Sequence, residues 1–225
     1  MDHGGRRDLD AEDLWVSLNE AALTARLKRA LATLGPVMAS EDFYLAGGTA
    51  VAIHLGHRRS VDLDWFAGHA IGDPLVLAKR LADRGLHLAV DKVASGKLHG
   101  RLDQTRVSFL EYRYPLLAHR VNWPEYQCQL AGLDDLAGMK LSAIAQRGAK
   151  KDFMDLYALV TNHRPLSELL ATYRRKYEIE DVAHVLYSLA YFDDADRERM
   201  PTMLWHLDWR TVKRAIRGWV KEIVR

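Results

Sequence analysis

The sequence predicts an α/β fold, an α+β arrangement in which a mixed sheet is flanked by helices and followed by a purely helical part. Up to about residue 130, short apolar or alternating runs typical of strands are interspersed with amphipathic helical patterns. From residue 133 onward only the helical spacing continues. We therefore expect residues 1–132 to form an α/β part with an N-terminal helix, and residues 133–225 to form a helical part.

Composition is that of an ordinary globular chain. Of the 225 residues, 48% are hydrophobic and 28% are charged, and the formal net charge of +2 does not by itself indicate a nucleic-acid binder. The lone Cys128 excludes an internal disulfide framework and predicts a reducing, cytoplasmic setting. We expect no association with a membrane, because no apolar run is long enough to span one and residues 1–13 lack a signal-peptide core.

The elements of the first part follow from hydrophobic spacing and from glycine and proline breaks. We expect a helix over 14–34 ended by Gly35-Pro36, a strand over 43–46, a helix over 50–55, a strand over 60–66, a helix over 73–85, and strands over 86–93, 107–112 and 125–130. In the second part we expect helices over 136–146, 153–160, 167–173, 182–189 and 211–224.

A glycine turn joins the first strand to the helix that follows it. Gly47, Gly48 and Thr49 lie at this junction, where glycines allow a tight turn and a close approach of the backbone to a ligand. The N-terminus of the next helix presents unpaired N–H groups, which suit a phosphate. Tight packing alone also explains such a turn, so both interpretations stay open.

Two carboxylates occupy one face of the predicted strand over 60–66. Asp62 and Asp64 are two residues apart, so both point to the same side, opposite the apolar Val61, Leu63 and Trp65. Mg²⁺ prefers carboxylates combined with phosphate oxygens. The alternative is that both acids face water, but the nearby glycine turn favours a metal and nucleotide site. The preceding Arg59-Ser60 offers either a phosphate contact or, through Arg59, a partner for Asp62.

A second group of charged residues lies in the helical part. Lys140 and Arg147 are seven residues apart on one predicted helix and share a face, and Lys151 and Asp152 precede the next helix. On its own this pattern is typical of two packed helices with a solvated basic turn.

Together these motifs resemble a known family. The run Gly47-Gly48-Thr49-Ala50 and the run Arg59 to Asp64 are similar to the signature of the DNA polymerase β-type nucleotidyltransferases, and more narrowly of the AbiEii/AbiGii abortive-infection toxins. The segment from Lys140 to Asp155 resembles the later conserved blocks of that family. The resemblance implies a polymerase β-type fold and transfer of a nucleotide from an NTP to an acceptor hydroxyl, with RNA, such as a tRNA 3′ end, as acceptor. It also implies a toxin–antitoxin pair acting in phage defence, with an antitoxin protein encoded alongside.

The same resemblance assigns the site. It implies that Asp62 and Asp64 bind Mg²⁺ and, with Lys140 and Asp152, are catalytic, and that residues 133–225 contribute to the active site. Nucleotide contacts are implied for Gly47, Gly48, Thr49, Arg59, Ser60, Lys140, Arg147 and Lys151.

One departure leaves the chemistry open. Many polymerase β-type enzymes carry a third carboxylate on a neighbouring strand, but Thr105 to Glu111 has no acid at its centre, and Asp103 and Glu111 lie at its ends. The site then holds one metal, recruits Asp152 as the base, turns over slowly, or has lost turnover. A non-catalytic nucleotide-binding protein and a metal-dependent phosphodiesterase stay as alternatives. Tyr112 and Tyr114 serve either sheet packing or a nucleobase shelf.

Overall fold

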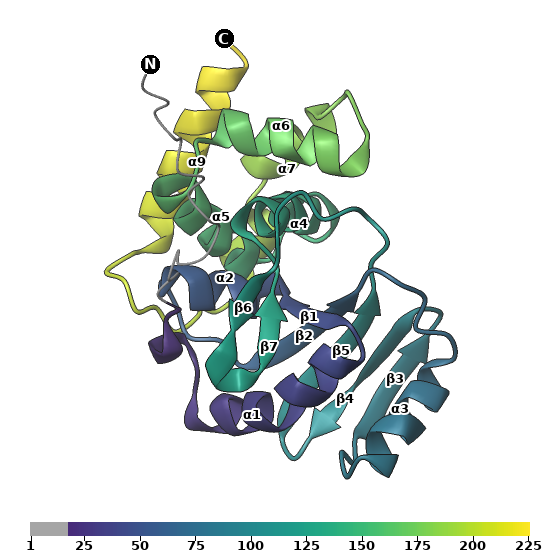
Figure 1. Cartoon of the computed structure of the whole chain (residues 1–225). Coiled ribbons are helices and arrows are strands. Elements are labelled where there is room, and N and C mark those ends of the chain that lie inside the picture. Colours follow the sequence, from purple (N-terminus) through teal and green to yellow (C-terminus); the bar gives the residue numbers. More distant parts are fainter. Residues whose placement is uncertain (1–17) are drawn as a thin grey trace, which may run out of the picture.

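The computed structural model describes residues 18–225, and in this part of the chain one mixed sheet carries all seven strands (Figure 1). The strand order is β3-β4-β5-β2-β1-β7-β6. Strands β2 and β5 pair in parallel, as do β1 and β7, and the other neighbours are antiparallel. The strands are β1 (Phe43–Ala46), β2 (Asp62–Ala67), β3 (Ala89–Ala94), β4 (Lys97–Leu102), β5 (Thr105–Glu111), β6 (Val121–Trp123) and β7 (Cys128–Leu130).

The helices divide between the sheet and a separate cluster. Helices α1 and α3 lie along the sheet, and α4 to α9 gather on its other side, beyond α2 (Figure 1). The helices are α1 (Ala25–Ser40), α2 (Gly47–Leu55), α3 (Pro74–Asp83), α4 (Leu133–Gln146), α5 (Lys150–Asn162), α6 (Leu166–Tyr177), α7 (Ala183–Ala190), α8 (Asp193–Arg197) and α9 (Trp209–Ile223). Short 3-10 turns occupy Glu20–Ala22 and Pro124–Tyr126. The α/β class predicted from hydrophobic spacing is confirmed.

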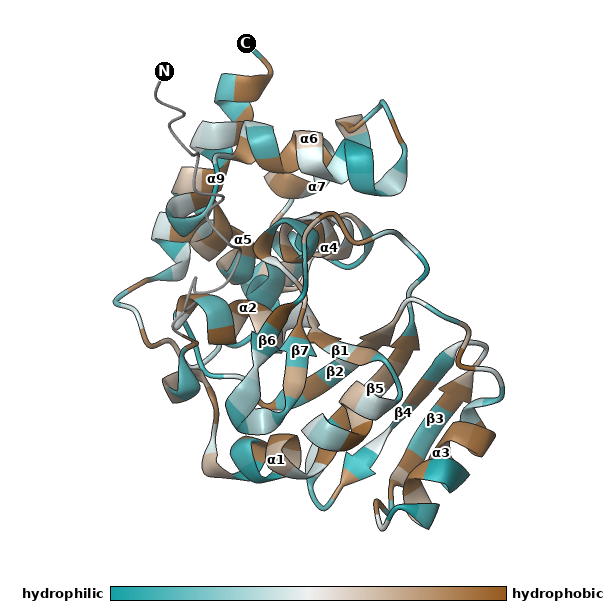
Figure 2. Cartoon of the chain, in the orientation of Figure 1, coloured by the Kyte–Doolittle hydropathy of each residue, from teal (hydrophilic) through white to brown (hydrophobic). Residues whose placement is uncertain are grey.

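Alternation along β5 and the first half of β2 gives this part of the sheet one apolar face and, around Asp62 and Asp64, one polar face. Leu63 and Trp65 of β2 and Phe109 of β5 are fully buried, and α1 packs against these two strands. The intervening residues of β2 point the other way, toward α2 and the helical cluster. Figure 2 shows the resulting alternation of hydropathy along the strands. The core packs against the apolar face of the sheet. The polar side chains on the other face are therefore available to form a site.

The first helix differs from the prediction at both ends. It begins at Ala25, where the Thr24 hydroxyl accepts a hydrogen bond from Leu27 N (3.2 Å), and it continues through Pro36 to Ser40. Residues 14–17 of the predicted helix lie outside the described residues. A proline inside a helix costs about 3 kcal/mol, but burial of large apolar side chains on either side of it, at about 1.5–3 kcal/mol each, offsets this cost. Those side chains are Leu34 and Met38, both fully buried.

Other differences reflect features that single-residue patterns do not encode. Strands β4 and β6 and the short helix α8 were not predicted, and α2 begins at Gly47 itself rather than at residue 50. Val61 lies just before β2 and is 60% exposed, so it is not part of the apolar face. Strand β4 contains Lys97, His99 and Arg101 and becomes a strand because it pairs on both sides, with β3 and with β5.

The chain turns from strands to helices close to the predicted point. Strand β7 ends at Leu130 and α4 begins at Leu133. Whether residues 1–132 and 133–225 behave as two units stays a prediction. Within residues 18–225, none of the helices has the length and apolar character needed to cross a membrane.

Candidate active site

A cavity of about 700 Å³ opens on the polar face of the sheet, between β2, β5 and helix α4. The register of β2 against β5 determines which side chains form the floor of this cavity. Asp62 lies opposite Arg106, Asp64 opposite Ser108, and Phe66 opposite Leu110, and all six side chains line the cavity. The two carboxylates therefore share one surface, as their spacing predicted.

The glycine turn forms the wall next to these carboxylates. Gly47 has a φ of +66°, which a side chain strongly disfavours, and a Cβ there would lie 3.0 Å from the Asp64 carboxylate. Helix α2 starts at this residue, and the side chain of its N-cap residue, Ala46, makes no capping hydrogen bond. The Thr49 hydroxyl donates a hydrogen bond to the backbone oxygen of Asp62 (2.5 Å) and lies 2.6 Å from the Ser60 hydroxyl. The turn therefore presents the first backbone N–H groups of α2 next to the Asp64 carboxylate.

Asp62 and Asp64 differ in their surroundings. Asp62 accepts a hydrogen bond from Arg106 Nε at 2.8 Å, and Arg106 is 67% exposed. Such an exposed ion pair contributes little stability, about 0–1 kcal/mol, so it leaves Asp62 available to a cation. In residues 18–225 no hydrogen bond or ion pair of the Asp64 carboxylate is found. Arg59 does not pair with Asp62; it lies at the rim of the same cavity with an exposed side chain.

A buried ion network lies behind the cavity and centres on Asp155. Its carboxylate accepts hydrogen bonds from His57 Nε2 (2.7 Å) and Arg58 Nε (2.6 Å), and it lies 2.6 Å from Lys140 Nζ. Burial alone would raise the pKa of Asp155, but the charges of Arg58 and Lys140 hold this pKa well below its ordinary value. Arg58 also donates to the backbone oxygen of Gly48 (3.1 Å). The network therefore ties the glycine turn to α4 and α5.

Asp152 lies behind the side of the cavity that the cations Lys140 and Arg147 line. It is fully buried and is bound by Lys140 Nζ (2.9 Å) and by Arg147 Nε (2.8 Å). Burial raises its pKa, but the charges of Lys140 and Arg147 outweigh that effect and lower it. Burial would in turn lower the pKa of Lys140, but Asp155 and Asp152 raise it, so the ammonium group stays charged. Asp152 thus orients two cations that line the cavity.

The structure brings nearly all the predicted site residues together. One cavity is lined by Gly47, Gly48, Thr49, Arg59, Ser60, Asp62, Asp64, Lys140, Arg147 and Lys151. Asp152 is the exception, because it lies behind Lys140 and Arg147 rather than on the surface of the cavity. Sequence reasoning missed Arg58, Arg106, Ser108 and His99 as members of this site. Of these, only Arg58 had a usable signal, its place in the basic pair before the aspartate strand.

Known proteins resemble this chain both in sequence and in fold. The model of the family described as "Nucleotidyl transferase AbiEii toxin, Type IV TA system" matches residues 105–218, just over half of the chain. The chain belongs to the AbiEii nucleotidyltransferase toxin family. An uncharacterised protein of Aquifex aeolicus is 40% identical over 158 residues, which is 70% of this chain and 77% of that relative. The matched family segment begins at β5, so the glycine turn and the aspartate pair lie before it.

Solved structures support the fold of this AbiEii family member. MenT4, a nucleotidyltransferase toxin of Mycobacterium tuberculosis, aligns with a TM-score of 0.54 at 15% identity, covering 91% of this chain and 84% of MenT4. JHP933 of Helicobacter pylori aligns with a TM-score of 0.53, also at 15% identity, over 92% of this chain and 93% of its own. At such low identity the likeness concerns the fold.

Within residues 18–225, the cavity of this AbiEii family member has no third carboxylate beside the aspartate pair. Opposite Asp64 on β5 is Ser108, whose hydroxyl lies 3.1 Å from His99 Nδ1 of β4. Neither of the end candidates reaches the cavity: Asp103 lies in the β4–β5 turn, and Glu111 accepts hydrogen bonds from Ile71 N and Arg113. Among residues 18–225 no group of three or more His, Cys, Asp or Glu side chains is arranged to hold a metal ion. The two aspartates therefore suit a cation whose remaining ligands come from phosphates and water.

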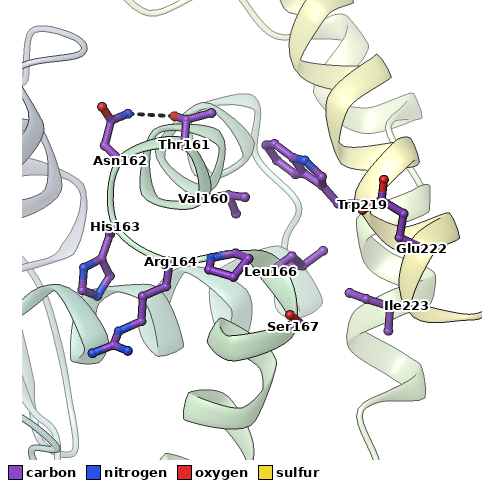
Figure 3. A pocket seen from close by; sticks show the side chains of 11 residues that line it. Val160, Thr161, Asn162, His163, Arg164, Leu166, Ser167, Trp219, Glu222 and Ile223 are labelled. Atoms are coloured by element: carbon purple, nitrogen blue, oxygen red, sulfur yellow. Dashed lines mark hydrogen bonds between the residues drawn. The ribbon is translucent and has the colours of Figure 1, made fainter.

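A second cavity, of about 850 Å³, lies between α5, α6 and α9. Figure 3 shows Trp219, Glu222 and Ile223 of α9 facing the end of α5 and the start of α6 across it. None of the sequence-predicted site residues lines this cavity, and it has no pair of carboxylates on one surface. The cavity over β2 and β5 is therefore the candidate active site.

Proposed function

We propose that this AbiEii family member transfers a nucleotide from a magnesium-bound NTP to an acceptor hydroxyl, with RNA, such as a tRNA 3′ end, as the acceptor. The observation that carries the proposal is the single cavity shared by Asp62, Asp64, the open start of α2 and the cations Lys140, Arg147 and Lys151. Carboxylates next to phosphate-binding groups are the arrangement that phosphoryl transfer requires.

In this proposal the triphosphate lies between α2 and the cationic side of the cavity. Backbone N–H groups of Gly48 and Thr49 and the side chains of Lys140 and Arg147 hold its oxygens. Asp152 keeps Lys140 and Arg147 aimed at the cavity and acts as a positioning residue. Asp62 and Asp64 would hold Mg²⁺, which would withdraw charge from the phosphates.

The reaction itself is a substitution at the α-phosphorus. The acceptor hydroxyl oxygen forms the new bond to the α-phosphorus, the bond to the bridging oxygen of the β-phosphate breaks, and pyrophosphate and the hydroxyl proton are released. Holding both reactants in one cavity replaces an encounter in solution by an oriented step.

The test is incubation of the purified protein with each α-labelled NTP, Mg²⁺ and total bacterial RNA, followed by a denaturing gel. We expect RNA to be labelled by the wild type and not by the Asp64→Asn variant, because the neutral amide no longer holds the cation. Asp103→Asn, in the β4–β5 turn away from the cavity, is the matched control and should label RNA normally. Equal labelling by wild type and Asp64→Asn would contradict the assignment of Asp64.

A second function is favoured by Ser108, which takes the place opposite Asp64 where a third acid would help to activate the hydroxyl. This function is binding of Mg·NTP without turnover. Tight NTP binding with no release of pyrophosphate and no labelled acceptor of any kind would support it. Shortening of RNA without added NTP would instead indicate a phosphodiesterase.

A toxin role in phage defence, restrained by an antitoxin encoded alongside, belongs to the same proposal. It is supported by the family, which is described as part of a type IV toxin–antitoxin system. Expression of the chain alone should slow bacterial growth, and expression of Asp64→Asn at the same level should not. Equal growth in both cultures would argue against a toxin whose action depends on nucleotide transfer.

A further inference from the structure

The active-site cavity changes character along its length. On one side of Asp64 it is lined by the glycine turn and by cationic side chains, and on the other side by apolar and aromatic ones. The second group consists of Phe66, Leu110, Tyr112, Met139 and Tyr177. These residues belong to β2, to the end of β5 and the residue that follows it, to α4 and to α6.

Strand geometry places this apolar end at a defined distance from the carboxylates. Phe66 follows Asp64 by two residues on β2 and points to the same face, so it lies roughly 7 Å farther along the strand. Leu110 lies opposite Phe66 on β5, and Tyr112 follows Leu110 by two residues. A ribose covers a comparable span between an α-phosphate and its base.

The aromatic side chains at this end are held in place from behind. The hydroxyls of Tyr112 and Tyr177 lie 2.7 Å apart and are hydrogen-bonded, and the Tyr112 ring meets Phe66 edge to face with centroids 5.6 Å apart. Tyr114 packs against both tyrosines from outside and does not line the cavity. Tyr112 and Tyr177 are therefore fixed in position, while each keeps partial exposure.

We infer that Tyr112, Tyr177 and Phe66 form the subsite for the nucleobase of the donor NTP. This inference rests on the proposed nucleotide transfer. With the α-phosphorus at Asp62 and Asp64 and the triphosphate at α2, Lys140 and Arg147, the nucleoside extends from the carboxylates toward the opposite end of the cavity. That end is lined by aromatic side chains, and nucleobases stack on aromatic rings. Because Tyr177 belongs to α6, the helical part of the chain takes part in recognition of the base.

The test separates the base from the triphosphate. Dissociation constants are measured by calorimetry for the magnesium complexes of a non-hydrolysable NTP and of inorganic tripolyphosphate, which has no base. We expect Tyr112→Leu and Tyr177→Leu each to weaken NTP binding roughly tenfold, because each variant removes a ring on which the base stacks. Tripolyphosphate binding should change less than twofold.

Two further variants control for the fold. Tyr187→Leu removes a 79% exposed ring on α7 that does not line the cavity, and should leave both dissociation constants unchanged. Tyr112→Phe keeps the ring but loses the hydrogen bond to Tyr177, and should retain most of the affinity for the NTP. Circular dichroism melting of each variant reports whether its fold is intact.

Each other outcome has a distinct meaning. Equal weakening of both ligands in Tyr112→Leu would overturn the inference and assign the tyrosines to the fold alone. Unchanged NTP affinity with an increased KM for RNA would overturn it in favour of a subsite for the acceptor's base. Failure of the wild type to bind either ligand would refute the proposed function itself, and with it this inference.

Discussion

At the scale of single residues, the structure separates charges that face the cavity from charges that hold the site together. Asp64 faces the cavity without a protein partner in residues 18–225, whereas Asp155 is fully buried and bonded to three cationic or polar side chains. Removing one partner from a buried pair leaves an uncompensated charge, so the buried carboxylates cannot be exchanged freely. The half-buried carboxylates that line the cavity are the ones that a cation can reach.

Two buried histidines make the free energy of unfolding depend on pH. Burial lowers the pKa of both His54 and His57, and for His57 it outweighs the hydrogen bond to Asp155. Below pH 6.5 the unfolded chain takes up protons that the folded chain does not. The stability that these two groups contribute is therefore complete above pH 6.5 and is lost as the pH falls from there toward their folded pKa values.

We expect urea unfolding to show this loss between pH 7.5 and pH 5.5, at up to roughly 1.4 kcal/mol per pH unit for each histidine. The variant with His54→Gln and His57→Gln should have a flatter profile. The control with His87→Gln and His206→Gln, both exposed, should keep the wild-type slope. If the wild-type and His54/His57 variant profiles ran parallel, the two histidines would not be the source of the pH dependence.

Residue patterns predicted the two aspartates, the glycine turn and the cations around them, because each of these motifs is short and local. They did not predict Arg106 as the partner of Asp62, because that pairing depends on the register between β2 and β5. Arg58 was visible as a basic residue, but its bond to Asp155 joins positions 97 residues apart. Contacts of this kind follow from the topology and not from local spacing.

At the scale of elements, hydrophobic spacing predicted the central strands and the long helices, and it was least accurate where packing overrides a break signal. Helix α1 continues through Pro36. The adjacent Gly35 lets the backbone of Tyr126 pack closely against the helix, because a Cβ at residue 35 would overlap the backbone oxygen of Tyr126. The glycine was read as a helix end, but its role is set by a neighbour that is remote in sequence.

Gly47, at the junction of β1 and α2, and Gly72, in the loop between β2 and α3, form a matched pair of glycines for a test. Gly47 and Gly72 have nearly the same backbone conformation, with φ of +66° and +67°. A Cβ at Gly47 would lie 3.0 Å from the Asp64 carboxylate, whereas a Cβ at Gly72 would have no atom of residues 18–225 within 4 Å apart from its chain neighbours. Alanine at either position costs about 1–2 kcal/mol of stability because of the left-handed backbone.

We expect Gly72→Ala to lower stability by that amount and leave nucleotide binding unchanged. Gly47→Ala should lower stability by at least as much and also weaken Mg·NTP binding, because the methyl group displaces Asp64 and crowds the start of α2. Urea unfolding and calorimetry measure the two effects. Equal nucleotide affinity in both variants would mean that the close approach at Gly47 is not needed by the ligand.

At the scale of the whole molecule, the candidate site belongs to both parts of the chain. Its floor comes from β2 and β5, and its other walls come from α4, the start of α5, Tyr177 of α6 and the segment Met200 to Thr202. That segment returns from the helical part to the aspartate strand, where Arg59 N donates to Thr202 O (2.8 Å). Sequence patterns placed a boundary near residue 132, and the family resemblance implied that residues on both sides of it contribute to the site.

Because the site and the buried ion network both cross that boundary, we expect residues 18–225 to unfold in one cooperative transition. Helix α2 packs against α4 and α5, and Asp155 of α5 binds Arg58 of the α/β part. A ligand that binds this site stabilises both parts at once. At a concentration of a hundred times its Kd, it adds about 2.7 kcal/mol of stability, which for a chain of this size raises Tm by roughly 5–10 °C.

Calorimetric melting with and without a non-hydrolysable Mg·NTP measures this coupling. We expect a single transition whose Tm rises with ligand in the wild type and hardly moves in Asp64→Asn, since that variant keeps the fold but loses the cation-binding carboxylate. Two transitions, of which only one moves with ligand, would show that the parts before and after residue 132 unfold independently. A single transition in which ligand raises the Tm of wild type and Asp64→Asn equally would place the nucleotide outside the cavity over β2 and β5.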